Sequence, residues 1–239
     1  MKKIILQFFL VVALTSCETL TETIENINFH SKNKNRLPGK RISILVQQRS
    51  IEPDTIARGH QIILPVPTYN KNWSQTGGNA NHAMHHLRLG AALQEEWSTS
   101  IGKGASGSER LMAQPITAHD RLFAMDSETT VSAYSISNGR NIWSTELTPE
   151  DEEDGHINGG LAFQNGKIFA ATGFGQVVAL SAKTGKILWR RDVGAPFRSA
   201  PTATGGRVFV ISLTNKLFVL NSLTGEILWT HSGIEETTN

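Results

Sequence analysis

The sequence has a single cysteine among its 239 residues, and this scarcity excludes an internal disulfide. Lysine and arginine number 23 against 21 acidic residues, so the chain lacks the basic excess that nucleic-acid binding requires. Beyond the N-terminus, no apolar run approaches the roughly 18 residues of a transmembrane helix. The hydrophobic fraction of 39% is instead that of an ordinary globular protein.

The N-terminal stretch MKKIILQFFLVVALTSC has the layout of a signal peptide. Two lysines precede an apolar run over residues 4–14, which is too short to be a typical membrane span. The segment LTSC resembles a bacterial lipobox, which implies cleavage after residue 16 and a lipidated, palmitate-carrying Cys17. In lipoproteins of this type, a residue such as Glu18 implies sorting to the outer membrane. The alternative is an ordinary signal peptide that happens to contain a cysteine.

Residues 17–70 predict a mostly extended tether between the lipid and the fold. Residues 18–40 are polar with few aromatics, and the three prolines Pro53, Pro65 and Pro67 disfavour a central strand. We therefore expect a signal peptide at 1–16, a lipidated cysteine and tether at 17–70, and the folded region at 71–239.

The folded region repeats itself. Tryptophans at positions 97, 143, 189 and 229 are separated by 46, 46 and 40 residues, and a fixed order of turns and short apolar segments recurs between them. Short strands bounded by Gly, Asn and Asp turns indicate β-structure, and four strands per repeat predict β-propeller blades. A solenoid of β-arches is the less favoured alternative, because its repeats are usually shorter.

Three eleven-residue segments carry the strongest repeat signal: AYSISNGRNIW, ALSAKTGKILW and VLNSLTGEILW. Glycine is always seventh and tryptophan eleventh, which singles out Gly139, Gly185, Gly225, Trp143, Trp189 and Trp229. We expect each glycine to adopt positive φ in a hairpin. We expect each indole to stack on the neighbouring blade and donate its N–H to a carbonyl there. These residues are therefore predicted to be structural.

The motif resembles the Ala-x-Asp-x-x-Thr-Gly-x-x-x-Trp docking motif of the pyrroloquinoline-quinone-like (PQQ-like) repeat. That family implies an all-β fold of four-stranded blades in an eight-bladed propeller, found in quinoprotein dehydrogenases and in non-enzymatic members. The third-position aspartate is replaced here by Ser135, Ser181 and Asn221, which accept a turn hydrogen bond less strongly than a carboxylate.

The sequence shows few of the features that an enzyme of this family needs. A quinoprotein dehydrogenase needs calcium ligands and a base, and many have adjacent cysteines, which this chain lacks. The acidic run 149–155 fails as a calcium loop because its twelfth position is Leu161. His82, His85 and His86 have no Cys or acidic fourth ligand at useful spacing. We therefore expect no enzyme, no catalytic residue, no metal and no cofactor, with a fragment of a PQQ-dependent dehydrogenase as the alternative.

The whole chain is similar to the BamB-like lipoproteins of the outer-membrane β-barrel assembly (BAM) machinery. The resemblance rests on the lipobox, the segment NWSQTGGNANHAMHHL, the successive blades and the segment HSGIEE. It implies a scaffold that is lipid-anchored at the periplasmic face of the outer membrane, docks on the central barrel subunit and receives unfolded outer-membrane proteins. A generic periplasmic PQQ-repeat binding lipoprotein is a second alternative.

One partner contact is carried over from this family. Its partner-binding loop follows a tryptophan strand, and here the corresponding stretch is GAPFRSAPT at residues 194–202. Phe197 is predicted as the apolar anchor and Arg198 as the polar one, a pair of types common at interface hot spots. This loop is two residues shorter than the family pattern, and the alternative is that Arg198 only solvates a blade connection.

The number of repeats falls short of a closed ring. Three full units and the Trp97 strand give about three to four of the expected eight blades. We therefore expect an open arc of blades, from a truncated gene product or a fragment of a longer chain.

Overall fold

The computed structural model describes residues 59–107, 110–152 and 157–234. The predicted signal peptide, Cys17 and most of the predicted tether lie outside the described residues. The chain divides into two compact units, Met1–Gln61 and Ile62–Asn239, and the strands of the described residues belong to the second unit. No helix in the described ranges has both the length and the apolar character needed to cross a membrane.

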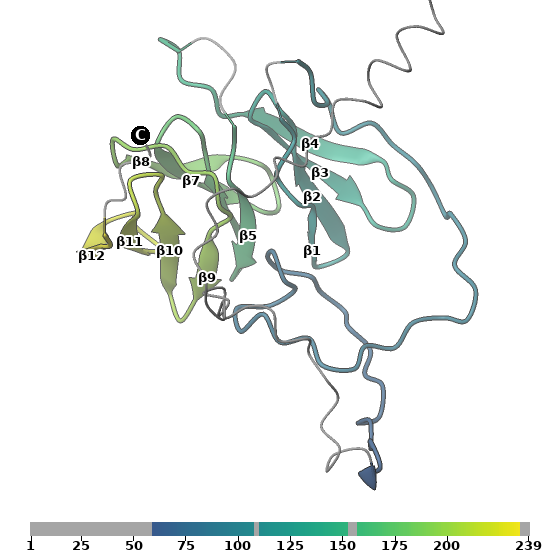
Figure 1. Cartoon of the computed structure of the whole chain (residues 1–239). Coiled ribbons are helices and arrows are strands. Elements are labelled where there is room, and N and C mark those ends of the chain that lie inside the picture. The colour runs from purple at the N-terminus through teal and green to yellow at the C-terminus, as the bar shows by residue number, and fades with distance from the viewer. Residues whose placement is uncertain (1–58, 108–109, 153–156, 235–239) are drawn as a thin grey trace, which may run out of the picture. The chain divides into compact units, whose positions relative to one another are not determined.

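The described chain forms three four-stranded antiparallel sheets, each built from consecutive strands (Figure 1). The first sheet contains β1 (Ile116–Ala118), β2 (Arg121–Met125), β3 (Thr130–Ser135) and β4 (Asn141–Glu146). The second contains β5 (Gly160–Gln164), β6 (Lys167–Ala171), β7 (Gln176–Ser181) and β8 (Ile187–Asp192). The third contains β9 (Thr202–Thr204), β10 (Arg207–Ile211), β11 (Lys216–Asn221) and β12 (Ile227–Ser232). The predicted all-β fold of four-stranded blades is confirmed, and we call these sheets the first, second and third blades.

Two-residue turns set the register of the first hairpin in each blade. His119 and Asp120 connect β1 to β2, Asn165 and Gly166 connect β5 to β6, and Gly205 and Gly206 connect β9 to β10. All six residues have positive φ, from 48° to 74°, which matches the right-handed twist of the flanking strands. The polar turns read from the sequence therefore place the strands in register.

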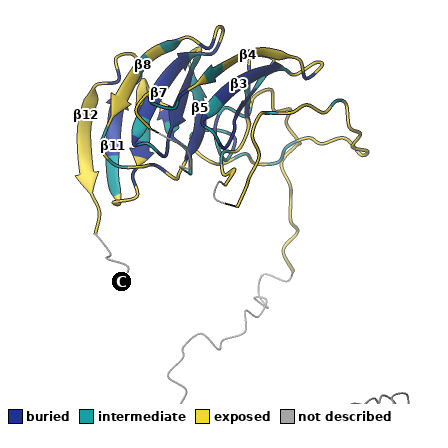
Figure 2. Cartoon of the chain, turned by 90° about the horizontal axis from the view of Figure 1, so that it is seen from above, coloured by how far each residue is buried: buried dark blue, intermediate teal, exposed yellow. Residues whose placement is uncertain are grey.

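The second blade is apolar on both faces because a blade packs on each side of it. Ile168 and Ala170 of β6 belong to the core shared with the first blade, whereas Phe169 and Ala171 belong to the core shared with the third. This period of two is the pattern of a strand buried on both sides. Figure 2 shows the consequence, because β7 is largely buried while β12 is exposed along its whole length.

A β-bulge occurs at the same place in every blade. The register slips by one residue opposite Ala133, Ala179 and Val219, immediately beside the tryptophan of the outermost strand. The extra residues are Ile142, Leu188 and Leu228, and each is exposed by 40–46%. A bulge turns the strand locally and redirects its side chains. Here it directs the apolar residue before each tryptophan outward.

Candidate functional site: the blade joints and the loop after Trp189

Two tryptophans of the motif, Trp143 and Trp189, each pack on the glycine turn of the next blade, forming what we call a joint. A Cβ added to Gly185 would lie 2.6 Å from Cε3 of Trp143, and one added to Gly225 would lie 2.6 Å from Cε3 of Trp189. The glycines have φ of 75° and 71°, as predicted. Only a residue without a side chain therefore fits under the indole, for reasons of both space and backbone conformation.

Hydrogen bonds complete each joint. Nε1 of Trp143 donates to the carbonyl of Ala182 at 3.2 Å, and Nε1 of Trp189 donates to that of Ser222 at 3.3 Å. These carbonyls stand at the fourth position of the motif in the next blade, so the predicted indole bond is confirmed for Trp143 and Trp189, and its acceptor is identified. The indoles thus combine apolar burial with a satisfied polar edge.

A second donor, two residues after the tryptophan, was not predicted from the sequence. Thr145 donates through Oγ1 to the carbonyl of Gly185 at 2.9 Å, and Arg191 donates through Nε to that of Gly225 at 2.8 Å. The two side chains differ in type but share a position and a function. The sequence does place a hydrogen-bond donor two residues after each of these tryptophans. Because one donor is a threonine and the other an arginine, the position is hard to recognise as part of the repeat.

Two further arginines bind carbonyls of a neighbouring blade. Arg121 donates through Nη1 to the carbonyls of Ala182 and Lys183, at 2.6 and 2.8 Å. Arg190 reaches the Leu147 carbonyl at 2.6 Å, and its partial burial lowers the pKa of its guanidinium. The guanidinium stays protonated at neutral pH because its ordinary pKa is so high. Both contacts therefore hold adjacent blades together through charge-assisted hydrogen bonds.

Trp97 makes the same joint without belonging to a strand. Its Nε1 donates to the Ile136 carbonyl at 2.6 Å, and a Cβ on Gly139 would lie 2.5 Å from its ring. The prediction of a Trp97 strand is nevertheless wrong, since residues 94–100 have no strand conformation. The indole contact and a hydrogen bond from the Tyr134 hydroxyl to the Ser100 carbonyl, at 3.2 Å, position this segment in place of a strand ladder.

The side chains that replace aspartate at the third position of the motif make different hydrogen bonds. Asn221 accepts hydrogen bonds at Oδ1 from the amides of Leu223 and Thr224, at 2.8 and 3.4 Å. Ser135 instead pairs with the Ser137 hydroxyl at 2.9 Å. In all three repeats the seventh-position glycine amide donates to the third-position backbone carbonyl, at 2.8–2.9 Å. The backbone therefore closes the turn even where the side chain differs from the family pattern.

A segment before the first blade connects the innermost strands of all three blades. Trp73 exchanges two backbone hydrogen bonds with Thr117, each 2.8 Å long, and the Ser74 carbonyl accepts from the Phe163 amide at 2.7 Å. The buried carboxamide of Gln75 then binds Ala203, accepting from its amide at 3.0 Å and donating to its carbonyl at 3.3 Å. No contact of Gln75 was predicted from the sequence, and its partner lies 128 residues away.

The loop after Trp189 separates its two predicted contact residues. Phe197 is fully buried, its ring centroid 6.4 Å from that of Phe218 in an edge-to-face arrangement. Its backbone pairs with Ser212 and donates to the Thr172 carbonyl at 3.2 Å, which turns the ring into the core between the second and third blades. The expected apolar anchor is therefore covered by the protein itself. Arg198 next to it is exposed, and its contact with a partner stays a prediction.

The candidate metal ligands that the structure describes do not assemble into a site. Among the described residues, no three His, Cys, Asp or Glu side chains come together as metal ligands would. His86 has Nδ1 2.7 Å from the Pro65 carbonyl, while His82 and His85 occupy turn positions with φ of 52° and 51°. Residues 153–155 of the acidic run lie outside the described residues. A quinone held through calcium therefore finds no carboxylate cluster among the side chains that the structure describes.

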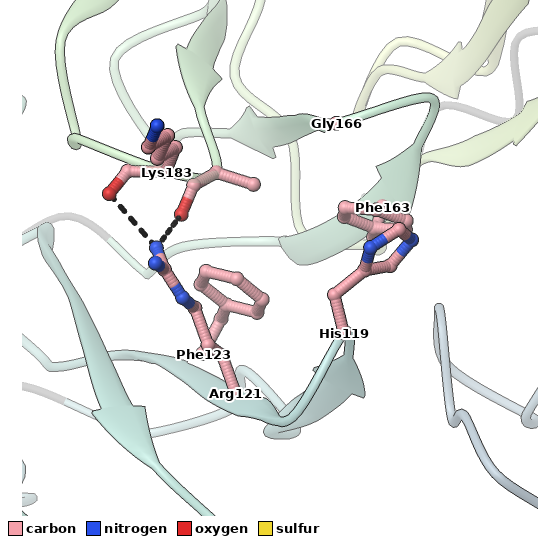
Figure 3. A pocket seen from close by; sticks show the side chains of 7 residues that line it. His119, Arg121, Phe123, Phe163, Gly166 and Lys183 are labelled. Atoms are coloured by element: carbon pink, nitrogen blue, oxygen red, sulfur yellow. Dashed lines mark hydrogen bonds between the residues drawn. The ribbon is translucent and has the colours of Figure 1, made fainter.

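A hollow of about 240 Å³ lies between the first and second blades (Figure 3). Arg121 reaches across one side of it to the Ala182 and Lys183 carbonyls, with Phe123 next to it. On the other side, His119 and Phe163 lie together, with ring centroids 5.2 Å apart. The lining carries three basic or imidazole side chains and no acid.

Comparison with known proteins connects this arrangement to one family. The family model described as outer membrane protein assembly factor BamB matches residues 127–239, which comprise most of the three blades. Over these residues the chain is a BamB-like PQQ-repeat protein. The BamB-like match begins just before β3 and includes all three glycine–tryptophan motifs.

Two relatives illustrate the likeness in sequence. An uncharacterized protein of Rickettsia prowazekii is 29% identical over 128 residues, covering 53% of this chain and 31% of that protein. Outer membrane protein assembly factor BamB of Yersinia pestis is 27% identical over 139 residues, covering 56% and 35%. The BamB-like chain thus matches about a third of the length of these relatives.

A solved structure illustrates the likeness in fold. The quinohemoprotein alcohol dehydrogenase of Comamonas testosteroni has a TM-score of 0.58 and 20% identity, covering 69% of this chain and 27% of that structure. This likeness concerns the fold alone. It places the BamB-like blades in an architecture that enzymes also use.

Proposed function

We propose that this chain is a non-enzymatic scaffold in the assembly of outer-membrane proteins. The observation that carries the proposal is the BamB family match over residues 127–239. The finer parts of the proposal are a lipid anchor at Cys17, a position at the periplasmic face of the outer membrane, and docking on the central barrel subunit of the BAM machinery. Unfolded outer-membrane proteins are the proposed clients.

The geometry of the loop at 194–202 supports a docking function for Arg198. Buried Phe197 fixes the loop to the core, and Arg198 extends from this fixed point into solvent. A guanidinium held at a defined position is suited to bidentate pairing with a carboxylate on a partner. Phe197 therefore acts as an internal anchor that positions Arg198, instead of contacting the partner itself.

The enzyme alternative has weaker support. The fold likeness to a quinohemoprotein dehydrogenase has no counterpart in the described side chains, which bring no carboxylate cluster together. Purified protein is expected to show no absorbance from a bound quinone after calcium and PQQ are supplied. A stoichiometric quinone spectrum would replace the scaffold proposal with the dehydrogenase one.

Affinity capture from outer membranes tests the proposal. The full chain, expressed in its own type of cell and extracted in mild detergent, is expected to co-purify with the central barrel subunit. Arg198→Ala is expected to reduce that yield at least fivefold without lowering thermal stability. Arg207→Ala, at another exposed arginine on β10, is the matched control and is expected to retain it. Capture without the barrel subunit by the wild-type chain would contradict the proposal and favour a generic binding lipoprotein.

A further inference from the structure

Three turns surround the hollow between the first and second blades. His119 belongs to the turn between β1 and β2, Gly166 to the turn between β5 and β6, and Lys183 to the turn that follows β7. A Cβ added to Gly166 would meet no atom within 4 Å, so open space adjoins this glycine. The volume of about 240 Å³ lies below that of a site for a drug-sized molecule and suits a ligand with a single ring.

One wall of the hollow is aromatic. Phe163 is half-buried, and its ring centroid lies 5.2 Å from that of the exposed His119 (Figure 3). Phe123 is fully buried and nearly parallel to Phe163, with centroids 6.4 Å apart and planes inclined by 16°. Phe123 thus supports Phe163 from the core, and Phe163 is the accessible ring. A wall of this kind favours an apolar, planar group.

The other wall presents an oriented guanidinium. Both hydrogen bonds of Arg121 to the carbonyls of the second blade use Nη1, which fixes the plane of the group. Its Nε and Nη2 have no hydrogen-bond partner among the described residues. Neither nitrogen is buried, because Oε1 of Gln164 is the one buried side-chain nitrogen or oxygen without a partner in the described part of the chain. Nε and Nη2 form an edge of the guanidinium that pairs bidentately with a carboxylate.

No acidic side chain neutralises this wall. The residues that line the hollow include the exposed Lys183 and His119 and no carboxylate. Asp120 lies in the same turn as His119 but is exposed and does not line the hollow. Within the described ranges, neither Arg121 nor Lys183 forms an ion pair. The local charge therefore attracts an anion and repels a cation.

We infer that this hollow binds a small aromatic carboxylate. The free edge of Arg121 pairs with the carboxylate, Phe163 contacts the ring, and Lys183 adds positive charge at the rim. Each wall alone offers a weak contact, and a single-ring acid engages both walls at once. The inference is independent of the scaffold proposal, because it depends only on side chains of the first two blades.

Titration of the full chain with benzoate, followed by NMR, tests the site. We expect saturable shifts of the backbone amides of His119, Gly166 and Lys183. Benzyl alcohol has the ring without the charge, and acetate has the charge without the ring. Each is expected to bind at least about tenfold more weakly than benzoate, because it engages only one wall. Benzylamine, which is cationic, is expected to give no saturable shift.

The guanidinium edge is tested by Arg121→Lys. This variant retains the positive charge but loses the planar edge, so benzoate is expected to bind at least about fivefold more weakly. Because Arg121 also holds two blades together, benzyl alcohol is titrated into the same variant. Its affinity is expected to stay at the wild-type value, which separates loss of the carboxylate contact from loss of the hollow.

The rim charge is tested by Lys183→Glu, which leaves the contact between the blades in place. Arg121 binds the backbone carbonyl of Lys183, and the substitution retains that carbonyl. Benzoate is expected to bind at least about threefold more weakly, while the affinity for benzyl alcohol and the thermal midpoint stay unchanged. Lys186→Glu is the matched control, because Lys186 is an exposed lysine of the same turn that does not line the hollow. Its effect on benzoate is expected to be smaller than that of Lys183→Glu.

Several outcomes would overturn the inference. One is the absence of a saturable shift with benzoate, and another is equal affinity for benzoate and benzyl alcohol. Equal weakening by Lys183→Glu and Lys186→Glu would assign the effect to net charge instead of to this site. Shifts with inorganic phosphate and none with benzoate would indicate a simple anion site. None of these outcomes affects capture of the barrel subunit, which depends on Arg198 and tests the proposed function separately.

Discussion

Trp143 and Trp229 occupy the same position of the same motif, yet they differ in burial and in hydrogen bonding. Trp143 is 9% exposed and bonded to the Ala182 carbonyl, whereas Trp229 is 48% exposed. Their own strands are alike, with the same bulge and the same pairing to the preceding strand. The difference is that a glycine turn of the next blade covers Trp143, and no described residue does this for Trp229. The burial of each tryptophan is therefore decided by the following blade.

The largest expected effect comes from removing the covered tryptophan. Trp143→Ala is expected to lower the free energy of unfolding by about 3–5 kcal/mol, because it empties a buried site and leaves the Ala182 carbonyl without its donor. Trp229→Ala is expected to lower it by less than about 1 kcal/mol. Urea unfolding of both variants measures the comparison, and equal losses would contradict it.

The glycine side of the joint is expected to give the next largest effect. Gly185→Ala places a Cβ 2.6 Å from the Trp143 ring and 2.7 Å from Thr145 Oγ1, at a φ of 75°. Gly166→Ala has nearly the same φ, 74°, but meets no atom within 4 Å, so it reports the backbone strain alone at about 1–2 kcal/mol. We expect Gly185→Ala to lower the free energy of unfolding by at least about 1 kcal/mol more than Gly166→Ala does, as measured by denaturant unfolding. A loss no larger than that of Gly166→Ala would show that the joint can relax.

The segment before the first blade offers a comparison with the joints. Gln75→Leu removes both hydrogen bonds to Ala203 and is expected to lower stability by about 2 kcal/mol, since two buried backbone groups lose their partners. Amide hydrogen exchange should accelerate at Ala203 while exchange at the Trp143 joint stays slow. Uniform acceleration across all three blades would mean that this segment stabilises the whole unit globally.

The smallest expected effect concerns the third position of the motif. Asn221→Asp restores the family residue at a position that already accepts two turn amides, and we expect a gain of about 0.5 kcal/mol at pH 7. Hydrogen bonds to the carboxylate lower its folded-state pKa, so the gain is present above the unfolded pKa of about 3.9 and is lost as pH falls through the folded value. Thermal unfolding at pH 7 and pH 2.5 measures this, and a gain that persists at pH 2.5 would rule out the charge.

The joints could be predicted because their parts lie within eleven consecutive residues. The spacing of Gly185 and Trp189 fixes a turn and a strand, and the repeat implies that each indole meets the next copy of that turn. The acceptor carbonyls and the second donors at Thr145 and Arg191 depend on how blades lie against each other. Spacing within one repeat contains no information on that arrangement.

The contacts of the loop after Trp189 and of the segment before the first blade could not be predicted, for a different reason. Phe197 precedes an exposed arginine in a polar loop, and its burial follows only from backbone pairing with Ser212, a partner outside the motif. Gln75 is one of several polar residues in its segment, and its partner Ala203 has no side chain that would mark the contact. Backbone partners leave no trace in the sequence pattern, so contacts of this kind need a structure.

The most direct test of the scaffold proposal is photo-crosslinking from position 198 in intact outer membranes. A photoreactive amino acid in place of Arg198 is expected to yield a crosslink to the central barrel subunit, and the same group in place of Arg207 is expected to yield none. A crosslink to that subunit from 207 but not from 198 would contradict the docking surface. Crosslinks from neither position, together with capture that lacks the barrel subunit, would contradict the proposed function itself.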